Sequence, residues 1–270
     1  MRVVFFDGYN LMHRARFGMV EGDYNMVYTF FRSFRSLVEQ MKGDKNILTL
    51  EGHPQFRYKL YPDYKANRRA DPADEKKAAD YQDFQRQKEI IVNILSRLPI
   101  EVLKHPDYEG DDLVGKLITS VYPDDEVIVI TGDTDFLQLF NQVDNVKIYQ
   151  PVKKTWVEDP KVNYVLQKSL IGDTSDNVAG VPGIGPKTAK KILAKSPEEL
   201  NDWLNEKIER KAIVERNLKL IKFADVPLEG IIKLNQEVDF DWIRNQFEMM
   251  DFQSMLTDKA WTKFVDTFSN

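Results

Sequence analysis

Short clusters of acidic residues are the part of this sequence best suited to chemistry. Two or three carboxylates lie within four residues of each other in the segments 109–112, 133–135 and 173–176. Any one pair is equally compatible with capping a helix N-terminus or facing water. With two isolated acids they make a set of nine carboxylates: Asp7, Glu51, Glu109, Asp111, Asp112, Asp133, Asp135, Asp173 and Asp176.

So many carboxylates around one crevice would repel each other strongly unless cations neutralised them. The chain has no cysteine and only three histidines, and hard oxygen ligands alone favour Mg²⁺ or Mn²⁺ over zinc. Two such ions roughly 4 Å apart are a known device for hydrolysing phosphodiester bonds, because they activate water and stabilise charge on the phosphate. We therefore expect a site for two or more divalent ions.

Three short apolar runs lead up to these acids. Residues 2–6 end at Asp7, residues 46–50 end at Glu51, and residues 126–131 end just before Asp133. Helix-like stretches separate the runs, which predicts an α/β fold with a mostly parallel twisted sheet and helices on both faces. In such sheets the functional crevice lies beyond the carboxyl ends of the strands, where all three acids fall.

The remaining segments suggest two domains. From Tyr64 to about Leu98 the chain is charged and helix-prone, as expected of either a solvated helix pair or a mobile arch over the crevice. After about residue 155 helical patterns replace strands. We therefore expect an α/β core at 1–155 and a helical subdomain at 156–270. We interpret the aromatic and Met residues of 240–268 as core residues. Through them the last helices would pack back on the first domain.

A glycine-rich segment at 180–193 is the second chemical signal. Gly183 and Gly185 permit a tight hairpin whose backbone amides approach a phosphate closely. Pro186 suits the first turn of a following helix, whose N-terminus is electropositive. A plain helix connector is the alternative. If the hairpin holds a nucleic-acid backbone without reading bases, its contacts are Gly183, Gly185, Lys187, Thr188, Lys190 and Lys191, while Ala189, Ile192 and Leu193 pack inward.

Composition limits the setting of this chemistry. The absence of cysteine fits a reducing compartment, and no run approaches the roughly 20 apolar residues of a membrane span. We expect a cytoplasmic protein without a membrane partner. The net charge of −5 is unfavourable for binding nucleic acid, but acids that hold metal ions account for much of it.

Together, these motifs resemble the structure-specific 5′ nuclease family, the flap endonucleases and 5′-3′ exonucleases, in its bacterial and bacteriophage form. The resemblance covers nearly the whole chain, and the motifs occur in family order: Asp7-Gly8 with Asn10, Tyr64-Lys65 with Arg68, Glu109 with Asp111-Asp112, Thr131-Gly132-Asp133 with Asp135, Gly172-Asp173 with Asp176-Asn177, and the Gly-Ile-Gly hairpin. It implies a PIN-like sheet, a helical arch at about 67–98 and a helix-three-turn-helix DNA-binding motif in the C-terminal subdomain.

The resemblance also implies residue roles. One metal ion is gathered by Asp7, Glu51, Glu109, Asp111 and Asp112, directly or through water, and another by Asp133, Asp135, Asp173 and Asp176. Lys65 resembles the lysine that stabilises charge on the scissile phosphate, and Arg68 a second phosphate clamp. Three roles stay open. Tyr64 is a ring for stacking a terminal base or a packing aromatic, Arg14 contacts DNA or lies on a helix surface, and Glu51 binds an ion or is a solvated strand-end acid.

The expected activity is that of a metal-dependent 5′-3′ exonuclease, a flap endonuclease or both, removing primers or flaps during replication. Its substrates would be DNA with 5′ ends, flaps or RNA-primer junctions, and some relatives bind K⁺ on the hairpin carbonyls. We expect a monomer from a bacterium or a phage-infected host. We also expect that no polymerase domain belongs to this protein and that it binds no sliding clamp, because the segment ending at Asn270 lacks a clamp-binding motif.

Two alternatives belong to other classes of protein. A noncatalytic DNA-binding protein of the same fold would keep the hairpin, but its carboxylate clusters would have decayed. A PIN-type ribonuclease shares the sheet and the acidic crevice, but usually lacks the hairpin and the arch. The sequence therefore favours the 5′ nuclease, while the choice between exonuclease and flap endonuclease stays open.

Overall fold

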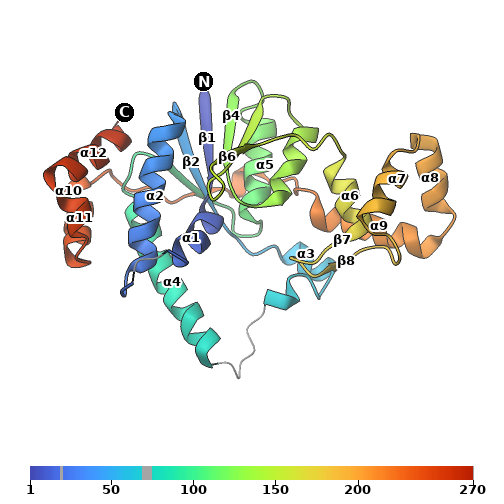
Figure 1. The fold of residues 1–270 in the computed structure, drawn as a ribbon, viewed down its shortest axis with the longest axis horizontal. Helices are drawn as coiled ribbons and strands as arrows, with labels where there is room; N and C mark the ends of the chain where they lie inside the picture. Colours follow the sequence, from blue (N-terminus) through green and yellow to red (C-terminus); the bar gives the residue numbers. More distant parts are fainter. Residues whose placement is uncertain (19–20, 69–74, 270) are drawn as a thin grey trace.

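The computed structural model describes residues 1–18, 21–68 and 75–269. A seven-stranded sheet in the order β6-β5-β4-β1-β2-β3-β9 forms its centre (Figure 1). The five inner strands are parallel, and the short edge strands β6 and β9 are antiparallel to their neighbours. The strands are β1 (Arg2–Asp7), β2 (Lys45–Leu50), β3 (Glu101–Lys104), β4 (Glu126–Ile130), β5 (Val146–Gln150), β6 (Thr155–Val157) and β9 (Ile232–Lys233). The predicted mostly parallel α/β sheet is confirmed.

Both faces of the sheet are buried, which explains why its strands read as continuous apolar runs. In β1, Val4 and Phe6 point to one face and Val3 and Phe5 to the other, and none of the four is exposed to solvent. Burying each phenylalanine side chain contributes about 1.5–3 kcal/mol. The first face is covered by α1 (Gly8–Arg16), α2 (Asn25–Met41) and α4 (Glu75–Leu95), and the second by α5 (Gly110–Ser120) and η2 (Thr134–Asn141).

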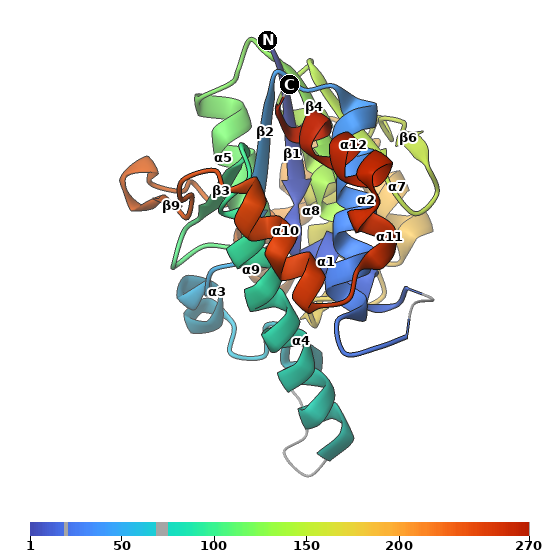
Figure 2. The same cartoon turned by 90° about the vertical axis from the view of Figure 1, so that its left-hand side faces the viewer.

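The C-terminal helices return to the first domain and cover the outer side of α2 (Figure 2). These helices are α10 (Phe240–Met249), α11 (Gln253–Leu256) and α12 (Asp258–Ser269). Ring contacts join the layers, because Phe31 lies 5.5 Å from Phe247 and Phe34 lies 5.8 Å from Phe268 between ring centroids. The aromatic spacing of this stretch therefore reflects packing in the core.

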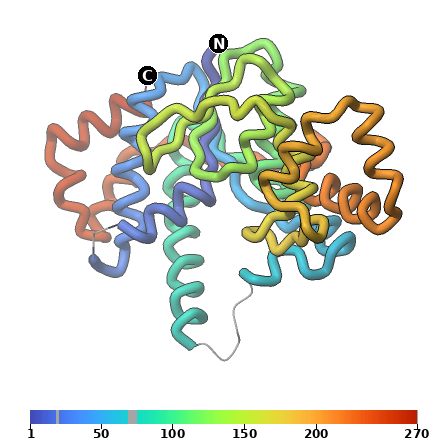
Figure 3. The backbone as a smooth tube through the Cα atoms, turned by 45° about the vertical axis from the view of Figure 1, so that its right-hand side comes forward, coloured from blue at the N-terminus to red at the C-terminus, as the bar shows by residue number. Residues whose placement is uncertain are grey.

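A charged segment extends away from the sheet. It follows α3 (Gln55–Leu60) and includes η1 (Ala66–Arg68) and α4. The buried side chains of α4 begin only at Phe84, so its first turns project beyond the rest of the molecule (Figure 3). Residues 69–74, which belong to the arch expected at about 67–98, lie outside the described residues.

A helical subdomain with its own small core stands beside the sheet. It consists of α6 (Tyr164–Ile171), the paired strands β7 (Gly172–Asp173) and β8 (Val178–Ala179), α7 (Pro186–Leu193), α8 (Pro197–Asn205) and α9 (Ile208–Ile221). The short η3 (Leu228–Gly230) follows next to the sheet domain, where Gly230 lies against His105. Leu170, Ala189 and Val214 form its centre. The chain then returns to the sheet as β9, so this edge strand comes from the C-terminal part of the sequence.

Within the described ranges, no helix is both long enough and apolar enough to span a membrane.

Candidate active site

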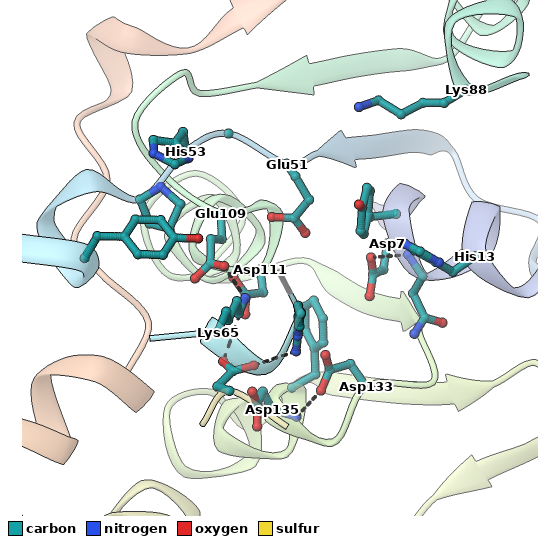
Figure 4. A pocket seen from close by; sticks show the side chains of 18 of the residues that line it. Asp7, His13, Glu51, His53, Lys65, Lys88, Glu109, Asp111, Asp133 and Asp135 are labelled. Carbon is teal, nitrogen blue, oxygen red and sulfur yellow. Dashed lines mark hydrogen bonds and ion pairs between the residues drawn. The ribbon is translucent and has the colours of Figure 1, made fainter. Parts of the chain in front are cut away.

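A cavity of about 870 Å³ opens beyond the carboxyl ends of β1, β2 and β4. Parallel strands bring residues at their carboxyl ends to one edge of the sheet. Figure 4 shows the acids converging there. Seven of the nine predicted carboxylates line this cavity: Asp7, Glu51, Glu109, Asp111, Asp133, Asp135 and Asp176.

Asp7 connects the end of β1 to the loop after β4. One of its oxygens caps α1 by accepting a hydrogen bond from the Asn10 amide at 3.1 Å, and the other accepts one from the Thr131 hydroxyl at 2.7 Å. The Thr131 hydroxyl in turn accepts a hydrogen bond from the Asp133 amide at 2.9 Å. Burial raises the pKa of Asp7. A single threonine therefore sets the positions of two of the acids.

Glu51 faces the cavity at the end of β2. Its Oε2 accepts a hydrogen bond from the Gly110 amide in the first turn of α5, at 3.0 Å. Burial, together with the neighbouring charge of Glu109, raises the pKa of Glu51 to about 8. The next residue must be glycine, because a Cβ at Gly52 would lie 2.0 Å from the carbonyl oxygen of His105. This close approach places Glu51 among the other acids rather than in bulk solvent.

Glu109 is held by three donors from the segment between β2 and α4. Its Oε2 accepts hydrogen bonds from Arg57 Nη1 at 2.7 Å and from the Tyr64 hydroxyl at 2.8 Å, and its Oε1 is contacted by the Lys65 ammonium group. Burial opposes its charge, but Lys65 and Arg57 outweigh that effect and hold the pKa of Glu109 below its usual value. Glu109 is therefore a charged, firmly oriented carboxylate.

Lys65 reaches the cavity from a strained backbone position. Its φ is +53°, in the left-handed region, which costs a non-glycine residue on the order of 1 kcal/mol. A hydrogen bond stabilises this backbone conformation, because the Lys65 amide donates to the carbonyl of Asp176 at 2.8 Å. Burial acts to lower the pKa of Lys65, but Glu109 and Asp176 raise it above its usual value. The lysine therefore stays protonated and aimed at the acids.

A second group of acids gathers where the helical subdomain meets the sheet. Oxygens of Asp135, Asp173 and Asp176 lie within 4.8 Å of one another. Arg68 Nη2 lies 2.5 Å from Asp176 Oδ1. Lys168 on α6, which the sequence reasoning missed, contacts Asp173 at 2.5 Å and Asp135 at 3.2 Å. Its position one helical turn before Gly172-Asp173 is the sequence feature from which Lys168 could have been predicted to lie near the acids.

Two predicted ligands, Asp112 and Asp173, do not line the cavity. Asp173 is 5% exposed and accepts hydrogen bonds from the Ser175 amide at 2.8 Å, the Ser175 hydroxyl at 2.6 Å and Lys168. Asp112 is fully buried against Arg57. Each still has an oxygen close to neighbouring acids, but hydrogen bonds within the protein use these oxygens.

Tyr64 is buried, and Arg14 lies outside the lining of the cavity. Tyr64 is 2% exposed and packs against Val178 and Leu220, so its ring offers no face to a terminal base. Of its two readings, the packing aromatic fits, and its hydroxyl also bonds to Asp176 at 3.0 Å. Arg14 does not line the cavity. Burial lowers its pKa, while the nearby Tyr149 phenol acts in the opposite direction.

The hairpin at 180–185 has the geometry expected from its glycines. Gly183 has φ +78°, with nothing within 4 Å of a Cβ placed there, and the Ile184 amide donates to the Val181 carbonyl at 3.0 Å. Gly185 is the N-cap of α7, and Pro186 is its first residue. Ala189 and Ile192 are buried as predicted. The predicted backbone-binding side chains are all exposed, namely those of Lys187, Thr188, Lys190 and Lys191.

The cavity wall opposite Lys65 was not predicted as part of the site. Tyr81, Gln85 and Lys88 face the cavity from α4 at a spacing of four and three residues, which places them on one side of the helix. His13 of α1 joins them, with its ring stacked on Phe84 at 4.4 Å. Lys88 donates to the Gln85 amide oxygen at 3.2 Å. Among the described residues it has no carboxylate within ion-pair distance.

The sequence matches two family models that together span most of it. Residues 2–168 match the 5′-3′ exonuclease N-terminal resolvase-like domain, and residues 160–254 match the 5′-3′ exonuclease C-terminal SAM fold. The chain belongs to the 5′-3′ exonuclease family. The resemblance to 5′ nucleases drawn from the sequence motifs is thereby confirmed.

Curated relatives of this 5′-3′ exonuclease family member are bacterial DNA polymerases I. The thermostable enzyme of Thermus filiformis is 31% identical over 94% of this chain but only 33% of its own length. The enzyme of Bacillus subtilis is 30% identical over 84% of this chain and 27% of its own length. The chain thus spans about a third or less of these relatives.

Solved structures share the fold. The bacteriophage T5 flap endonuclease, solved with DNA and metal ions, has a TM-score of 0.67 at 19% identity and covers 100% of both chains. The T5 5′-exonuclease with bound zinc has a TM-score of 0.66 at 19% identity, with 100% of this chain and 98% of that chain covered. The predicted fold, a mostly parallel sheet with a helical C-terminal subdomain, is confirmed by this likeness.

The donors in the cavity suit hard divalent cations. Among the described residues, seven carboxylates line it against three cationic side chains, Lys65, Arg68 and Lys88. Burial and the charge of Asp112 raise the pKa of Asp111 well above its usual value, and burial with the charge of Asp135 raises that of Asp133 to about 6. Crowded acids with raised pKa values are stabilised in their charged form by bound cations. The donor set therefore fits Mg²⁺ or Mn²⁺.

Proposed function

We propose that this protein is a divalent-metal-dependent 5′ nuclease that hydrolyses phosphodiester bonds near the 5′ ends of DNA. It acts as a 5′-3′ exonuclease, a flap endonuclease or both. The observation that carries the proposal is the convergence of seven carboxylates with Lys65 and Arg68 in one cavity at the carboxyl ends of the parallel strands. Family membership supports the same reading.

Two groups of acids would hold the ions. Asp7, Glu51, Glu109 and Asp111 form the first, and Asp133, Asp135, Asp173 and Asp176 form the second. Mg²⁺ or Mn²⁺ bound there would activate the attacking water and offset the negative charge that develops on the phosphate. Structures of T5 relatives solved with metal ions support metal binding in this family.

Lys65 and Arg68 would bind the scissile phosphate. Both cations pair with acids of the cavity, Lys65 with Glu109 and Arg68 with Asp176, so they lie where a phosphate held between the two acid groups would contact them. Lys65 remains protonated because of its neighbours. Its charge would therefore stabilise the transition state without a proton transfer.

DNA would be held on both sides of this centre. The amides at Gly183 and Gly185, the N-terminus of α7 and the exposed lysines beside them would bind the backbone of the duplex. The 5′ strand would pass beneath the proposed arch at about 67–98, along the face of α4 that carries Tyr81 and Lys88. Aromatic rings and cations in one groove are typical of single-strand binding.

We further propose a role in removing primers or flaps during replication or repair, because the relatives with matching sequence are DNA polymerases I. The protein would act as a monomer in the cytoplasm of a bacterium or a phage-infected cell. K⁺ at the hairpin carbonyls would assist backbone binding.

Cleavage of matched DNA substrates tests this function. We would compare 5′-flap, nicked, blunt and single-stranded DNA, each labelled once at the 5′ end and once at the 3′ end, with Mg²⁺ and with EDTA. The proposal predicts products released from the 5′ side and complete loss of cutting in EDTA. Activity that survives EDTA, or degradation from the 3′ end, would contradict it. The ratio of flap to nick cleavage separates endonuclease from exonuclease.

A further inference from the structure

Arg57 lies behind the active-site cavity with its guanidinium group buried. Its side chain comes from α3, is 2% exposed and does not line the cavity. Nη1 donates to Glu109 Oε2 at 2.7 Å and to Asp112 Oδ2 at 2.5 Å, and Nη2 donates to Asp112 Oδ1 at 2.7 Å. Nε donates to the carbonyl of Leu220 at 2.9 Å and Nη2 to that of Lys222 at 3.3 Å. All three nitrogens are therefore committed to the protein.

Asp112 is equally committed. Besides Arg57, its Oδ1 accepts a hydrogen bond from the Ala224 amide at 2.7 Å, and its Oδ2 accepts one from the Glu109 amide at 3.2 Å. A carboxylate accepts about four hydrogen bonds, and Asp112 makes all four without exposure to solvent. Neither oxygen has a lone pair left for an ion in the cavity. Its closeness to Glu109 results from sharing Arg57.

We propose that Arg57 is a positioning residue for the metal site and that Asp112 is its anchor rather than a metal ligand. This inference rests on the proposed function and explains why Asp112, which the family resemblance implied as a ligand, is left out of its ligand set. The anchored guanidinium takes up Oε2 of Glu109, together with the Tyr64 hydroxyl. Only Oε1, which Lys65 contacts, remains for the cavity. Arg57 thereby decides which oxygen of Glu109 meets the ion.

The same guanidinium joins the metal site to the helical subdomain. Leu220 belongs to the last turn of α9, and Lys222 caps that helix. The Ala224 amide, which bonds to Asp112, follows directly in the chain. The start of α5, which carries Glu109 and Asp111, is thus tied to the end of α9 through one buried pair. The orientation of the acids depends on this tie and not on α5 alone.

A double-mutant cycle tests the inference. Arg57→Gln, Asp112→Asn and the double variant are titrated with Mn²⁺ by calorimetry without DNA, and kcat and KM are measured on a 5′-flap substrate. Loss of a group that supports a metal ligand typically costs about 10–100-fold in metal affinity or activity. We expect each single change to lower Mn²⁺ affinity and kcat within that range, with KM unchanged. The double variant should lose no more Mn²⁺ affinity and kcat than the more impaired single variant does, because both changes disrupt the same Arg57–Asp112 pair.

Asp111→Asn is the matched control, because Asp111 lines the cavity and is adjacent to Asp112. It should remove a Mn²⁺ ion from the titration, whereas Asp112→Asn should keep the wild-type number. Loss of an ion in Asp112→Asn, or losses in the double variant that multiply those of the single variants, would overturn the inference.

Folding is checked separately, because a lone charge left by a single change destabilises a buried pair. If a single variant does not fold, Arg57→Met combined with Asp112→Leu leaves no unpaired charge. This variant should still bind the wild-type number of Mn²⁺ ions, and loss of one ion would contradict the inference. The Mn²⁺ titration does not depend on cleavage. Wild-type protein that binds Mn²⁺ but cuts no substrate would sink the proposed function alone.

Discussion

Lys65 and Glu109 form an ion pair at the rim of the cavity, and Arg57 and Tyr64 hold the same carboxylate from the opposite side. The lysine adopts a left-handed backbone conformation to make this contact. The pair places one fixed positive charge beside the acids, where a phosphate would come to lie.

Lys65→Met should slow cleavage far more than it weakens DNA binding. Loss of one donor to a transition-state charge costs about 10²–10³-fold in kcat, while the hairpin contacts remain. Single-turnover rates in Mg²⁺, compared with binding measured in Ca²⁺, check this expectation. Lys59→Met on α3, whose side chain is exposed and outside the cavity, is the control and should cut normally. An equal loss in both variants would contradict the role of Lys65.

Lys187→Ala should weaken DNA binding without changing the chemical step. The exposed lysine lies in the first turn of α7, next to the hairpin. Removing one phosphate contact reduces the slope of log affinity against log salt by about 1. Fluorescence anisotropy at several salt concentrations measures that slope. Lys259→Ala in α12, an equally exposed lysine on the other side of the molecule, should leave it unchanged, and an unchanged slope in Lys187→Ala would argue against the hairpin contact.

Lys88→Ala should impair cleavage of substrates with a single-stranded 5′ flap. Burial and the nearby charge of Lys104 lower the pKa of Lys88, while Glu89 and Glu51 act in the opposite direction. No described carboxylate lies within ion-pair distance of its ammonium group, which is therefore available to bind an anion. Loss of one charge-assisted hydrogen bond corresponds to about a tenfold rise in KM. Lys76→Ala, on the same helix but outside the cavity, is the matched control. Equal KM values for the two variants would show that Lys88 does not contact the 5′ strand.

His13 should make the protein less stable in mild acid. Burial, with the charges of Arg16, Arg68 and Lys88, lowers the pKa of His13. The unfolded chain then binds a proton here more readily than the folded protein does, so stability falls as the pH decreases below about 6.5. His13→Gln lacks this contribution. When the pH is lowered from 7 to 5, the melting temperature should decrease more for the wild type than for the variant. Equal decreases in the two proteins would contradict this effect of His13.

The sequence predicted those parts of the site that follow from local pattern. Strands ending at Asp7 and Glu51 place their acids at one edge of a parallel sheet, and the glycines of the hairpin require a tight turn. Burial of Tyr64 could not be predicted, because it depends on Val178 and Leu220 from the distant subdomain.

The Arg57–Asp112 pair was hidden for the same reason. It forms only because the chain after α9 returns to α3 and supplies the carbonyl of Lys222 and the amide of Ala224. Asp112 was predicted as a ligand because the sequence does not show in which direction an acid next to Asp111 points its side chain.

Strand β9 could not be predicted either. It has only two residues, Ile232 and Lys233, which is too short for an alternation of polar and apolar side chains to be visible.

The most direct test of the central claim, hydrolysis at the carboxylate cavity, is the activity of Asp133→Asn on a 5′-flap substrate. Asp133 lines that cavity, and burial together with the charge of Asp135 raises its pKa to about 6. With Mg²⁺ this variant should not cut, yet in Ca²⁺ it should bind the same DNA as tightly as the wild type does. Asp144→Asn, an exposed acid outside the cavity, should cut normally. Normal cutting by Asp133→Asn would show that the hydrolytic site lies elsewhere.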